Sequence, residues 1–322
     1  TASDITEIMR HSDAACYVAK DQGRNRIHLH QINDQAIART QGEMQWVSKI
    51  HQGIQNQQFV LYAQIIESLA DETLNEDYSD NELSNIAVQQ PRETHAEILI
   101  RYCDKNGHIV PPGAFLPAAE RYGVMNKLDC YVIKSTFEQL SENSHVFEEI
   151  NTFGINLSGQ SIADPDFLHF VISQFESHPA LPRHICFEIT ETAAISNFST
   201  AMHFISSGKQ CGCRFSLVDF GSGLSSFSYL KNLPVDYVKI DGEFIKDIVN
   251  NSINFAMAES INNIAHLMGK RTVAEFVENN EIRDQLIMLG VDFGQGYGIH
   301  VPEPIENLFS FDSSSSSIKQ AC

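Results

Sequence analysis

Short apolar runs that each end on a polar residue recur through most of this chain, and they constrain its fold more than any other feature. Buried parallel strands read as continuous Val, Ile, Leu and Phe runs. In a barrel of such strands, the residues at the carboxyl ends meet at one mouth, where barrel enzymes have their active sites. Seven runs deliver, in chain order, Glu97, Asn156, Glu188, Asp219, Lys239 with Asp241, Glu275 and Gln295.

The spacing of the runs predicts the fold class. Eight strand candidates lie between residues 59 and 298, beginning with FVLYAQII at 59–66, and they alternate with segments of helical pattern. This alternation implies an α/β protein with a parallel sheet and right-handed crossovers, and eight strands imply a closed, TIM-like (β/α)8 barrel. An open doubly wound sheet is the alternative, but no Gly-rich dinucleotide loop follows the first strand.

The organisation along the chain predicts one large domain with short flanking pieces. Residues 1–30 read as a helix and a short strand, 31–52 as a helical linker, and 53–308 as the barrel domain. Within the barrel, the segment 67–93 carries eight acids and one base, as expected of a solvated loop. The serine-rich tail at 309–322 is expected to be disordered. The first residues read as mid-protein, so we expect a longer parent chain.

Charge and composition exclude several classes of partner. The formal net charge is −19, with 22 basic and 41 acidic residues, which argues against DNA or broad nucleic-acid binding. A small anionic ligand stays possible, because a metal can reverse the field inside one cleft. The sequence contains no signal-peptide pattern and no membrane-spanning run, and its seven cysteines form no CxxC pair. We therefore expect a cytoplasmic location, or the cytoplasmic part of a membrane-anchored sensor.

The polar strand endings indicate a divalent-metal site. Mg²⁺ and Mn²⁺ prefer hard oxygen ligands, and four separate strands offer such ligands in Glu97, Asn156, Glu188 and Asp219. A paired-metal site can activate water and stabilise the oxyanions of a phosphoryl displacement. Phosphodiesters, enolisable acids and sugars are all compatible substrates, and spacing alone does not choose among them.

A set of motifs in a fixed order then points to a family. They are LYAQII, Glu97-Ile98-Leu99-Ile100-Arg101, PPGAFLPAAERYG, INLSG, FEITET, VDFGSGLSSFSYLKNLPVDYVKID, AEFVEN and QGYG. From about residue 48 to 305 the chain resembles the EAL family of cyclic di-GMP phosphodiesterases. The stretch SDAACYVAKDQGRNRIH within 1–30 resembles the end of a GGDEF (diguanylate cyclase) domain, although the GGDEF signature is absent.

The resemblance implies a role for each matching residue. The metal ligands would be Glu97, Asn156, Glu188 and Asp219, in a two-metal site for Mg²⁺ or Mn²⁺. The catalytic groups would be Lys239, which positions or activates water, Asp241, which supports it, and Glu275, a base or further ligand. The nucleotide contacts would be Gln64, Arg101 and Asp129, with Gln295 and Glu278 lining the mouth. Glu191 would brace the loop that begins at Asp219, through Ser222.

Two positions depart from the family pattern. Ile98 replaces the Ala of the EAL signature, which is a conservative apolar change. Val218 replaces the first Asp of the DDFG motif, which is expected to reach both metals. Val supplies no oxygen, so we expect hydrolysis to be weakened or lost unless Asp219 takes over the bridging position. Because adjacent strand residues point opposite ways, this would require the strand end to twist.

Three functions follow from this pattern. The first is a metal-dependent phosphodiesterase that converts cyclic di-GMP to linear pGpG, weakened by Val218. The second is a cyclic di-GMP receptor without turnover, signalling through the linker or through a homodimer of the barrel domain. The third is a purely structural or protein-interaction barrel.

Overall fold

A computed structural model describes residues 35–69, 93–221 and 227–310 of the 322-residue chain, together with the single positions 5, 9, 12 and 27. For 35–41 only the backbone is described. The predicted GGDEF remnant at 1–30, most of the acidic insert at 67–93, the tail beyond residue 310 and Ser222 lie outside the described residues.

The strands correspond to the apolar runs of the sequence, with two short additions. They are β1 (Phe59–Ser68), β2 (Thr94–Cys103), β3 (Ile109–Val110), β4 (Thr152–Leu157), β5 (Ile185–Thr190), β6 (Arg214–Phe220), β7 (Tyr237–Ile240), β8 (Arg271–Ala274), β9 (Phe293–Gly294) and β10 (Glu303–Pro304).

Helices fill most of the connections between the strands. They are α2 (Gln35–Gln55), α3 (Leu116–Arg121), α4 (Met125–Glu142), α5 (Gly159–Ile162), α6 (Pro165–Ser177), α7 (Glu191–Ser196), α8 (Phe198–Cys211), α9 (Phe227–Leu230), α10 (Gly242–Ile245), α11 (Ser252–Leu267) and α12 (Asn280–Met288). Short 3-10 helices lie at Pro112–Ala114, Ser144–Glu148, Pro182–His184 and Ile305–Ser310. None of the helices in the described part of the chain has the length and apolar content needed to cross a bilayer.

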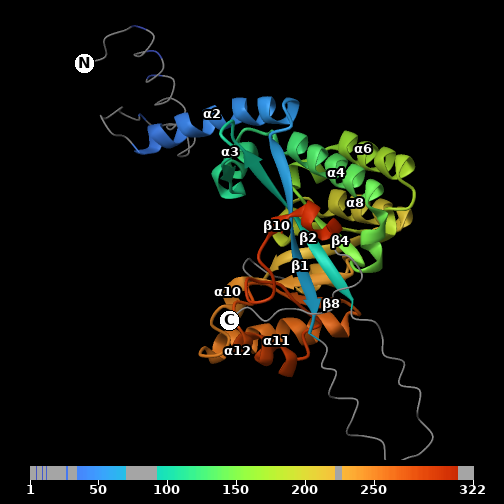
Figure 1. The fold of residues 1–322 in the computed structure, drawn as a ribbon. Coiled ribbons are helices and arrows are strands. Elements are labelled where there is room, and N and C mark those ends of the chain that lie inside the picture. Colours follow the sequence, from blue (N-terminus) through green and yellow to red (C-terminus); the bar gives the residue numbers. More distant parts are fainter. Residues whose placement is uncertain are drawn as a thin grey trace, which may run out of the picture. The chain divides into compact units, whose positions relative to one another are not determined.

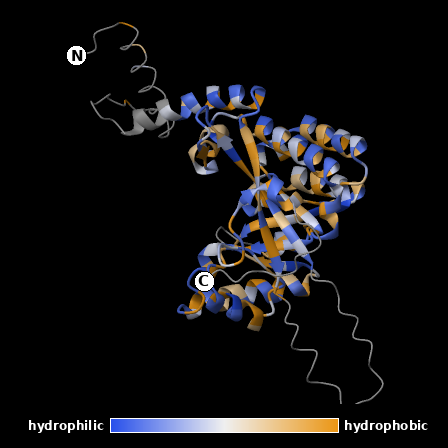
Figure 2. Ribbon diagram, in the orientation of Figure 1, coloured by the Kyte–Doolittle hydropathy of each residue, from blue (hydrophilic) through white to orange (hydrophobic). Residues whose placement is uncertain are grey.

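Eight of the strands close into a barrel, which confirms the predicted TIM-like fold. Their order is β1-β9-β8-β7-β6-β5-β4-β2, and β1 also pairs with β2. From β2 through β9 the barrel neighbours run parallel. Helices such as α4, α6, α8 and α11 lie outside the strands and carry both hydrophilic and hydrophobic residues (Figures 1 and 2). This pattern is expected of helices that pack one face on a barrel.

One strand departs from the all-parallel expectation. β1 pairs antiparallel with β9, with Glu67 opposite Gly294, and antiparallel with β10, with Tyr62 opposite Pro304. A parallel pairing requires a crossover connection, whereas an antiparallel pairing does not. The apolar run at 59–66 correctly predicts a strand, but its residues carry no information about the direction in which that strand joins the barrel.

The described chain separates into two compact units. The smaller unit consists of the described residues within 1–60 and 101–128, and the larger of the described residues within 61–100 and 129–322. In the smaller unit, an aromatic cluster joins α2 to its neighbours: Trp46 lies 5.3 Å from Tyr102 and 5.7 Å from Phe115, between ring centroids. Arg121 of the same unit forms a 2.8 Å ion pair with Glu43.

Phenylalanine side chains dominate the layer between the barrel and its helices in the larger unit. Phe215 on β6 is fully buried, and its ring centroid lies 5.8 Å from that of Phe187 on β5 and 6.1 Å from that of Phe204 on α8. Aromatic pairs at these separations add to the stabilisation from burial. These contacts hold α8 against the strands that carry the polar endings.

Polar caps start several helices directly after the strands. Ser158 accepts a hydrogen bond from the Ser161 amide at the start of α5, and Thr190 accepts one from the Ala193 amide at the start of α7. Such caps satisfy amides that have no partner within the helix. The strands β4 and β5 therefore pass into helices within a residue or two, which fixes the backbone at their carboxyl ends.

Replacing Phe215 with Ala should lower the free energy of unfolding by about 3–5 kcal/mol, because the change leaves a cavity between β5, β6 and α8. Urea denaturation followed by circular dichroism measures the loss. Met288, whose side chain is 69% exposed, provides the matched control, and Met288→Ala should change the free energy by less than about 0.5 kcal/mol. Equal losses in the two variants would contradict this assignment of the core.

Candidate functional site

A buried lysine forms the centre of the polar cluster. Lys239 on β7 is only 2% exposed, and its ammonium group lies among three carboxylates. Its Nζ is 2.9 Å from Oε2 of Glu97, 3.0 Å from Oε2 of Glu188 and 3.2 Å from Oε1 of Glu275. β2, β5 and β7 carry three of these four residues, and Glu275 directly follows β8. The structure thus brings together four of the residues predicted from the strand endings.

Amide side chains extend the cluster around Glu97. Asn156 Nδ2 donates to Oε1 of Glu97 at 2.6 Å, and Gln295 Nε2 donates to Oε2 at 2.7 Å. Gln295 also donates to Oε1 of Gln64 at 3.0 Å, and Gln64 Nε2 in turn donates to the carbonyl of His300 at 2.8 Å. Both oxygens of Glu97 are therefore engaged. The network fixes the orientation of the first predicted ligand.

A glycine in β4 makes room for one of the acids. Gly154 lies opposite Cys186 in the β4–β5 pairing, and a methyl group on Gly154 would collide with the Glu188 carboxylate. A glycine inside a strand often marks such a close approach. Gly154 is not among the site residues predicted above, although its place inside the run GINLS was a usable signal. His300, which accepts from Gln64, had no comparable signal.

Burial and crowding set the protonation of the acids. Burial raises the pKa of Glu188 to about 8, and the neighbouring carboxylates of Glu97 and Glu275 add to the rise against the pull of Lys239. Burial also raises the pKa of Glu275, which Lys239 opposes. Glu97 differs: burial acts upward on its pKa, but the Lys239 ammonium and the hydrogen bonds from Lys239, Gln295 and Asn156 leave it below its usual value.

The end of β6 is twisted at the position of the unusual valine. Val218 is 5% exposed and pairs with Thr190, whereas Asp219 is exposed and has a φ of +56°. The register between β6 and β7 shifts between Leu217 and Phe220. Partial burial raises the pKa of Asp219, the charges of Asp241 and Glu97 add to this rise, and Lys239 opposes it. The charges of Lys239 and Glu97 therefore act on the Asp219 carboxyl, and the backbone at this position departs from regular strand geometry.

Three other predicted residues hold the backbone of the mouth. Asp241 caps α10, with Oδ1 accepting from the Glu243 amide at 2.8 Å. Glu191, the first residue of α7, accepts from the Gly221 amide at 3.3 Å, within the loop that begins at Asp219. Asp129 is 5% exposed, and its Oδ2 accepts from the Ser158 amide at 2.9 Å and from the Ser161 hydroxyl at 2.6 Å.

Three predicted residues remain, Glu278, Arg101 and Ser222. Glu278 is exposed on the loop after β8. Arg101 is half-buried on β2 and belongs to the smaller compact unit. Ser222 lies outside the described residues. The roles of these three residues stay predictions.

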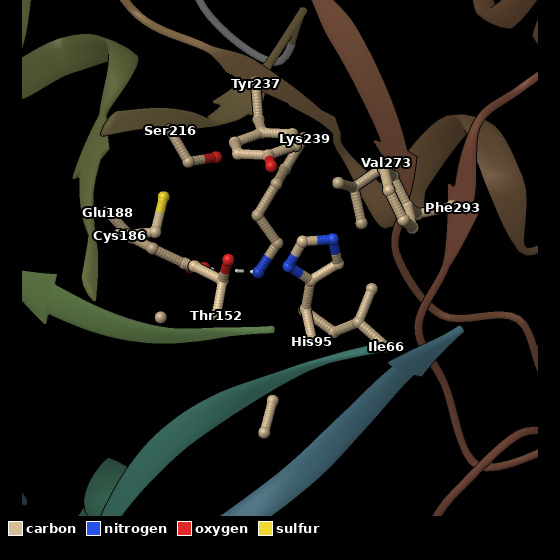
Figure 3. A pocket seen from close by; sticks show the side chains of 12 residues that line it. Ile66, His95, Thr152, Cys186, Glu188, Ser216, Tyr237, Lys239, Val273 and Phe293 are labelled. Atoms are coloured by element: carbon tan, nitrogen blue, oxygen red, sulfur yellow. Dashed lines mark hydrogen bonds and ion pairs between the residues drawn. The ribbon is translucent and has the colours of Figure 1, made fainter. Parts of the chain in front are cut away.

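A cavity lies inside the barrel on the side of Lys239 away from the strand carboxyl ends. Its wall includes His95, Thr152, Cys186, Ser216 and Tyr237. Each of them comes before the polar residue at the end of its own strand, and therefore lies closer to the amino end of that strand. Figure 3 shows the Lys239 stem crossing this space towards Glu188. The cavity is not the mouth of the barrel. Ile66, Val273 and Phe293 also line the cavity, together with Lys239.

The donor chemistry of the mouth fits a divalent cation. Three carboxylates converge on a single positive charge, and Oε1 of Gln295 is buried without a hydrogen-bond partner among the described residues. Hard oxygen donors of this kind are the ligands that Mg²⁺ and Mn²⁺ prefer. Within the described ranges no three acidic, His or Cys side chains are already arranged to hold a metal. The Lys239 ammonium occupies the place where their charges converge.

Comparison with known proteins identifies relatives of this barrel. The family model for the EAL domain matches residues 85–302. The cyclic di-GMP phosphodiesterase PdeB of Shewanella oneidensis is 36% identical over 93% of this chain and 33% of its own length. The cyclic di-GMP phosphodiesterase PdeF of Escherichia coli is 35% identical over 66% of this chain and 28% of its own length. The chain thus spans about a third of the length of these relatives.

Solved structures share the same architecture. The PaMucR phosphodiesterase in complex with cyclic di-GMP has a TM-score of 0.71 at 25% identity, covering 82% of this chain and 99% of that one. The FimX EAL domain from Pseudomonas aeruginosa bound to cyclic di-GMP has a TM-score of 0.67 at 25% identity, covering 80% and 96%. These likenesses extend over most of the barrel.

The raised pKa of Glu188 predicts a pH-dependent stability. The folded protein keeps a proton on Glu188 up to about pH 8, whereas the unfolded chain releases it near 4.5. The contribution of this group to stability is therefore fully present below pH 4.5 and is lost as the pH rises through about 8. The free energy of unfolding of the wild type should therefore fall as the pH rises from about 5 to 9. In Glu188→Gln, which has no titrating group at this position, the fall should be smaller by on the order of a few kcal/mol.

Urea denaturation in EDTA at several pH values measures this difference. The exposed Glu259 on α11 offers the matched control, because Glu259→Gln should follow the wild-type profile. If the Glu188→Gln profile ran parallel to the wild-type profile over the whole pH range, the Glu188 carboxyl would not be the source of the pH dependence of stability.

Proposed function

Because this chain belongs to the EAL domain family, we propose that its barrel binds cyclic di-GMP at the mouth formed by the strand carboxyl ends. The cluster of Lys239 with Glu97, Glu188 and Glu275 is the observation that carries the proposal. Two relatives are named as cyclic di-GMP phosphodiesterases, and two structural neighbours contain cyclic di-GMP. The acidic overall charge is consistent with a small anionic ligand held through cations rather than with a nucleic-acid polymer.

We propose that the site works with Mg²⁺ or Mn²⁺. The residues that would hold the ions are Glu97, Asn156, Glu188 and Asp219. When bound, such ions supply positive charge to the phosphodiester and lower the pKa of a water. The phosphates of the ligand are negatively charged, and so are the carboxylates of the mouth. The ligand can therefore bind there favourably only when the cations are present.

The chain's own groups then have defined tasks. Lys239, held at hydrogen-bond distance from two carboxylates, would place its ammonium beside the reacting water and the developing negative charge. Oε1 of Glu275 lies next to that ammonium and would accept the proton of the water. Gln64 and Gln295 would line the mouth beside Glu97. Arg101 and Asp129 would support the nucleotide, Arg101 through its guanidinium and Asp129 through the Ser158 segment that it braces.

We propose that hydrolysis is much slower than in relatives with a complete acid pair on this strand. Val218 is buried and apolar and supplies no oxygen to a metal. Loss of a direct ligand should exceed the roughly 10–100-fold effect of losing a supporting contact. The irregular backbone at Asp219 and the action of the Lys239 and Glu97 charges on its carboxyl support some remaining activity, with Asp219 in the bridging position. A receptor without turnover is the second candidate, and buried Val218 beside an otherwise intact cluster favours it.

Titration calorimetry tests the binding proposal. With Ca²⁺ to support binding without turnover, cyclic di-GMP should bind the wild-type protein, and EDTA should weaken the binding strongly because the acids then repel the phosphates. Glu97→Gln should weaken binding in Ca²⁺ by about 10-fold or more, since it removes a charged metal ligand. The exposed Glu259→Gln serves as the control. Absence of binding by the wild type under all these conditions would leave only a structural barrel.

Restoring the missing acid tests the catalytic proposal. Val218→Asp should raise the rate of conversion of cyclic di-GMP to pGpG by at least about 100-fold in Mg²⁺ or Mn²⁺, because it returns a metal ligand. Chromatographic separation of the products measures the rate. Val218→Asn, which has the shape of the Asp variant without its charge, is the matched control and should give a much smaller increase. A folded Val218→Asp protein that binds the ligand but remains as slow as the wild type would show that the valine is not the cause.

A further inference from the structure

A strained aromatic residue lies beside the proposed base. Phe276 has a φ of +56°, a left-handed conformation that a bulky side chain rarely adopts, and it directly follows Glu275. Its side chain is 48% exposed. Residues held in such conformations gather at ligand-binding sites, where the surrounding structure maintains them. Packing in the core does not explain this residue, since about half of its surface stays accessible.

The ring is held from one side by the start of α10. A methyl group on Gly242 would collide with the Phe276 ring, so only glycine permits this contact. Lys246 places Nζ 3.9 Å from the ring centroid, a cation–π distance. Gly242 and Lys246 are one helical turn apart, since the Lys246 amide donates to the Gly242 carbonyl at 3.0 Å. The two contacts therefore fix the ring against one short helix.

The position of the ring places it at the rim of the mouth. Phe276 follows the carboxyl end of β8, and Gly242 follows Asp241 at the carboxyl end of β7. The ring thus lies over the turn that begins with Asp241, and it is next in sequence to Glu275, whose carboxylate contacts Lys239. In a barrel of this type, ligands bind at this end of the strands.

We propose that Phe276 is a specificity-determining residue whose accessible ring face stacks on a purine base of the bound nucleotide. This inference rests on the proposed cyclic di-GMP binding and adds a contact that recognises the base rather than the phosphate. A preformed ring that is already ordered loses little freedom on binding. Base–aromatic stacking depends on the flat face of the ring, so an aliphatic side chain of similar size does not replace it.

Substitutions at position 276 separate stacking from a structural role. Phe276→Gly keeps the left-handed backbone without strain, so the protein stays folded, and its affinity for cyclic di-GMP in Ca²⁺ should fall about 10-fold. The affinity of Phe276→Leu for cyclic di-GMP should fall by a similar factor, whereas Phe276→Tyr should retain the wild-type affinity. Leu267→Ala, at an 88% exposed site at the end of α11, is the control and should bind as the wild type does.

Phe276→Trp adds a spectroscopic readout. The natural chain has one tryptophan, Trp46, so the wild-type protein reports the response of Trp46 alone. Stacking predicts that cyclic di-GMP quenches the added fluorescence in Phe276→Trp, while inorganic phosphate does not. Wild-type affinity in both Phe276→Gly and Phe276→Leu would overturn the proposal. So would a Phe276→Trp protein whose added fluorescence does not change when cyclic di-GMP binds. If the wild type itself did not bind, the proposed function would fail first, and calorimetry shows this separately.

Discussion

The contact of one ammonium group with three carboxylates is the constraint on which the interior of this barrel depends. Lys239 is enclosed at 2% exposure, and Glu97, Glu188 and Glu275 lie within 3.2 Å of its Nζ. Without that charge, buried acids from three strands would repel one another in a medium of low dielectric constant. Burial raises the pKa of Glu188 and of Glu275 although Lys239 opposes the rise, whereas at Glu97 the ammonium and the hydrogen bonds from Lys239, Gln295 and Asn156 outweigh burial and lower the pKa.

Backbone exceptions at the strand ends shape the mouth around this contact. Gly154 leaves space for the Glu188 carboxylate, and Asp219 at the end of β6 has a left-handed backbone conformation. Phe276 carries the same unusual conformation directly after Glu275. Asp219 and Phe276 have left-handed backbones and Gly154 lacks a side chain, and all three lie at or beside proposed site residues, where strain or missing volume serves the arrangement of side chains.

Binding and catalysis place different demands on this arrangement. Holding a nucleotide requires cations and hydrogen-bond donors at the mouth, and most of the predicted groups surround Glu97 and Lys239. Cutting a phosphodiester also requires positive charge to be positioned accurately beside both the attacking and the leaving oxygen. In the function that we propose, Val218 affects mainly the second demand, because it is buried in β6 and contributes packing instead of an oxygen. Under this proposal, a single strand position separates recognition from turnover.

The sequence by itself determined the eight barrel strands, the polar residues at their ends and the family, because these depend on local patterns of residue type. It also located Val218 as the exception. Only the tertiary structure decided that β1 runs antiparallel to β9, that Lys239 joins three acids and that Gln64 reaches His300. These features depend on which residues from distant segments meet, and on strand direction and twist. Periodicity along the chain does not encode such contacts, which arise when the barrel closes and its charges must find partners.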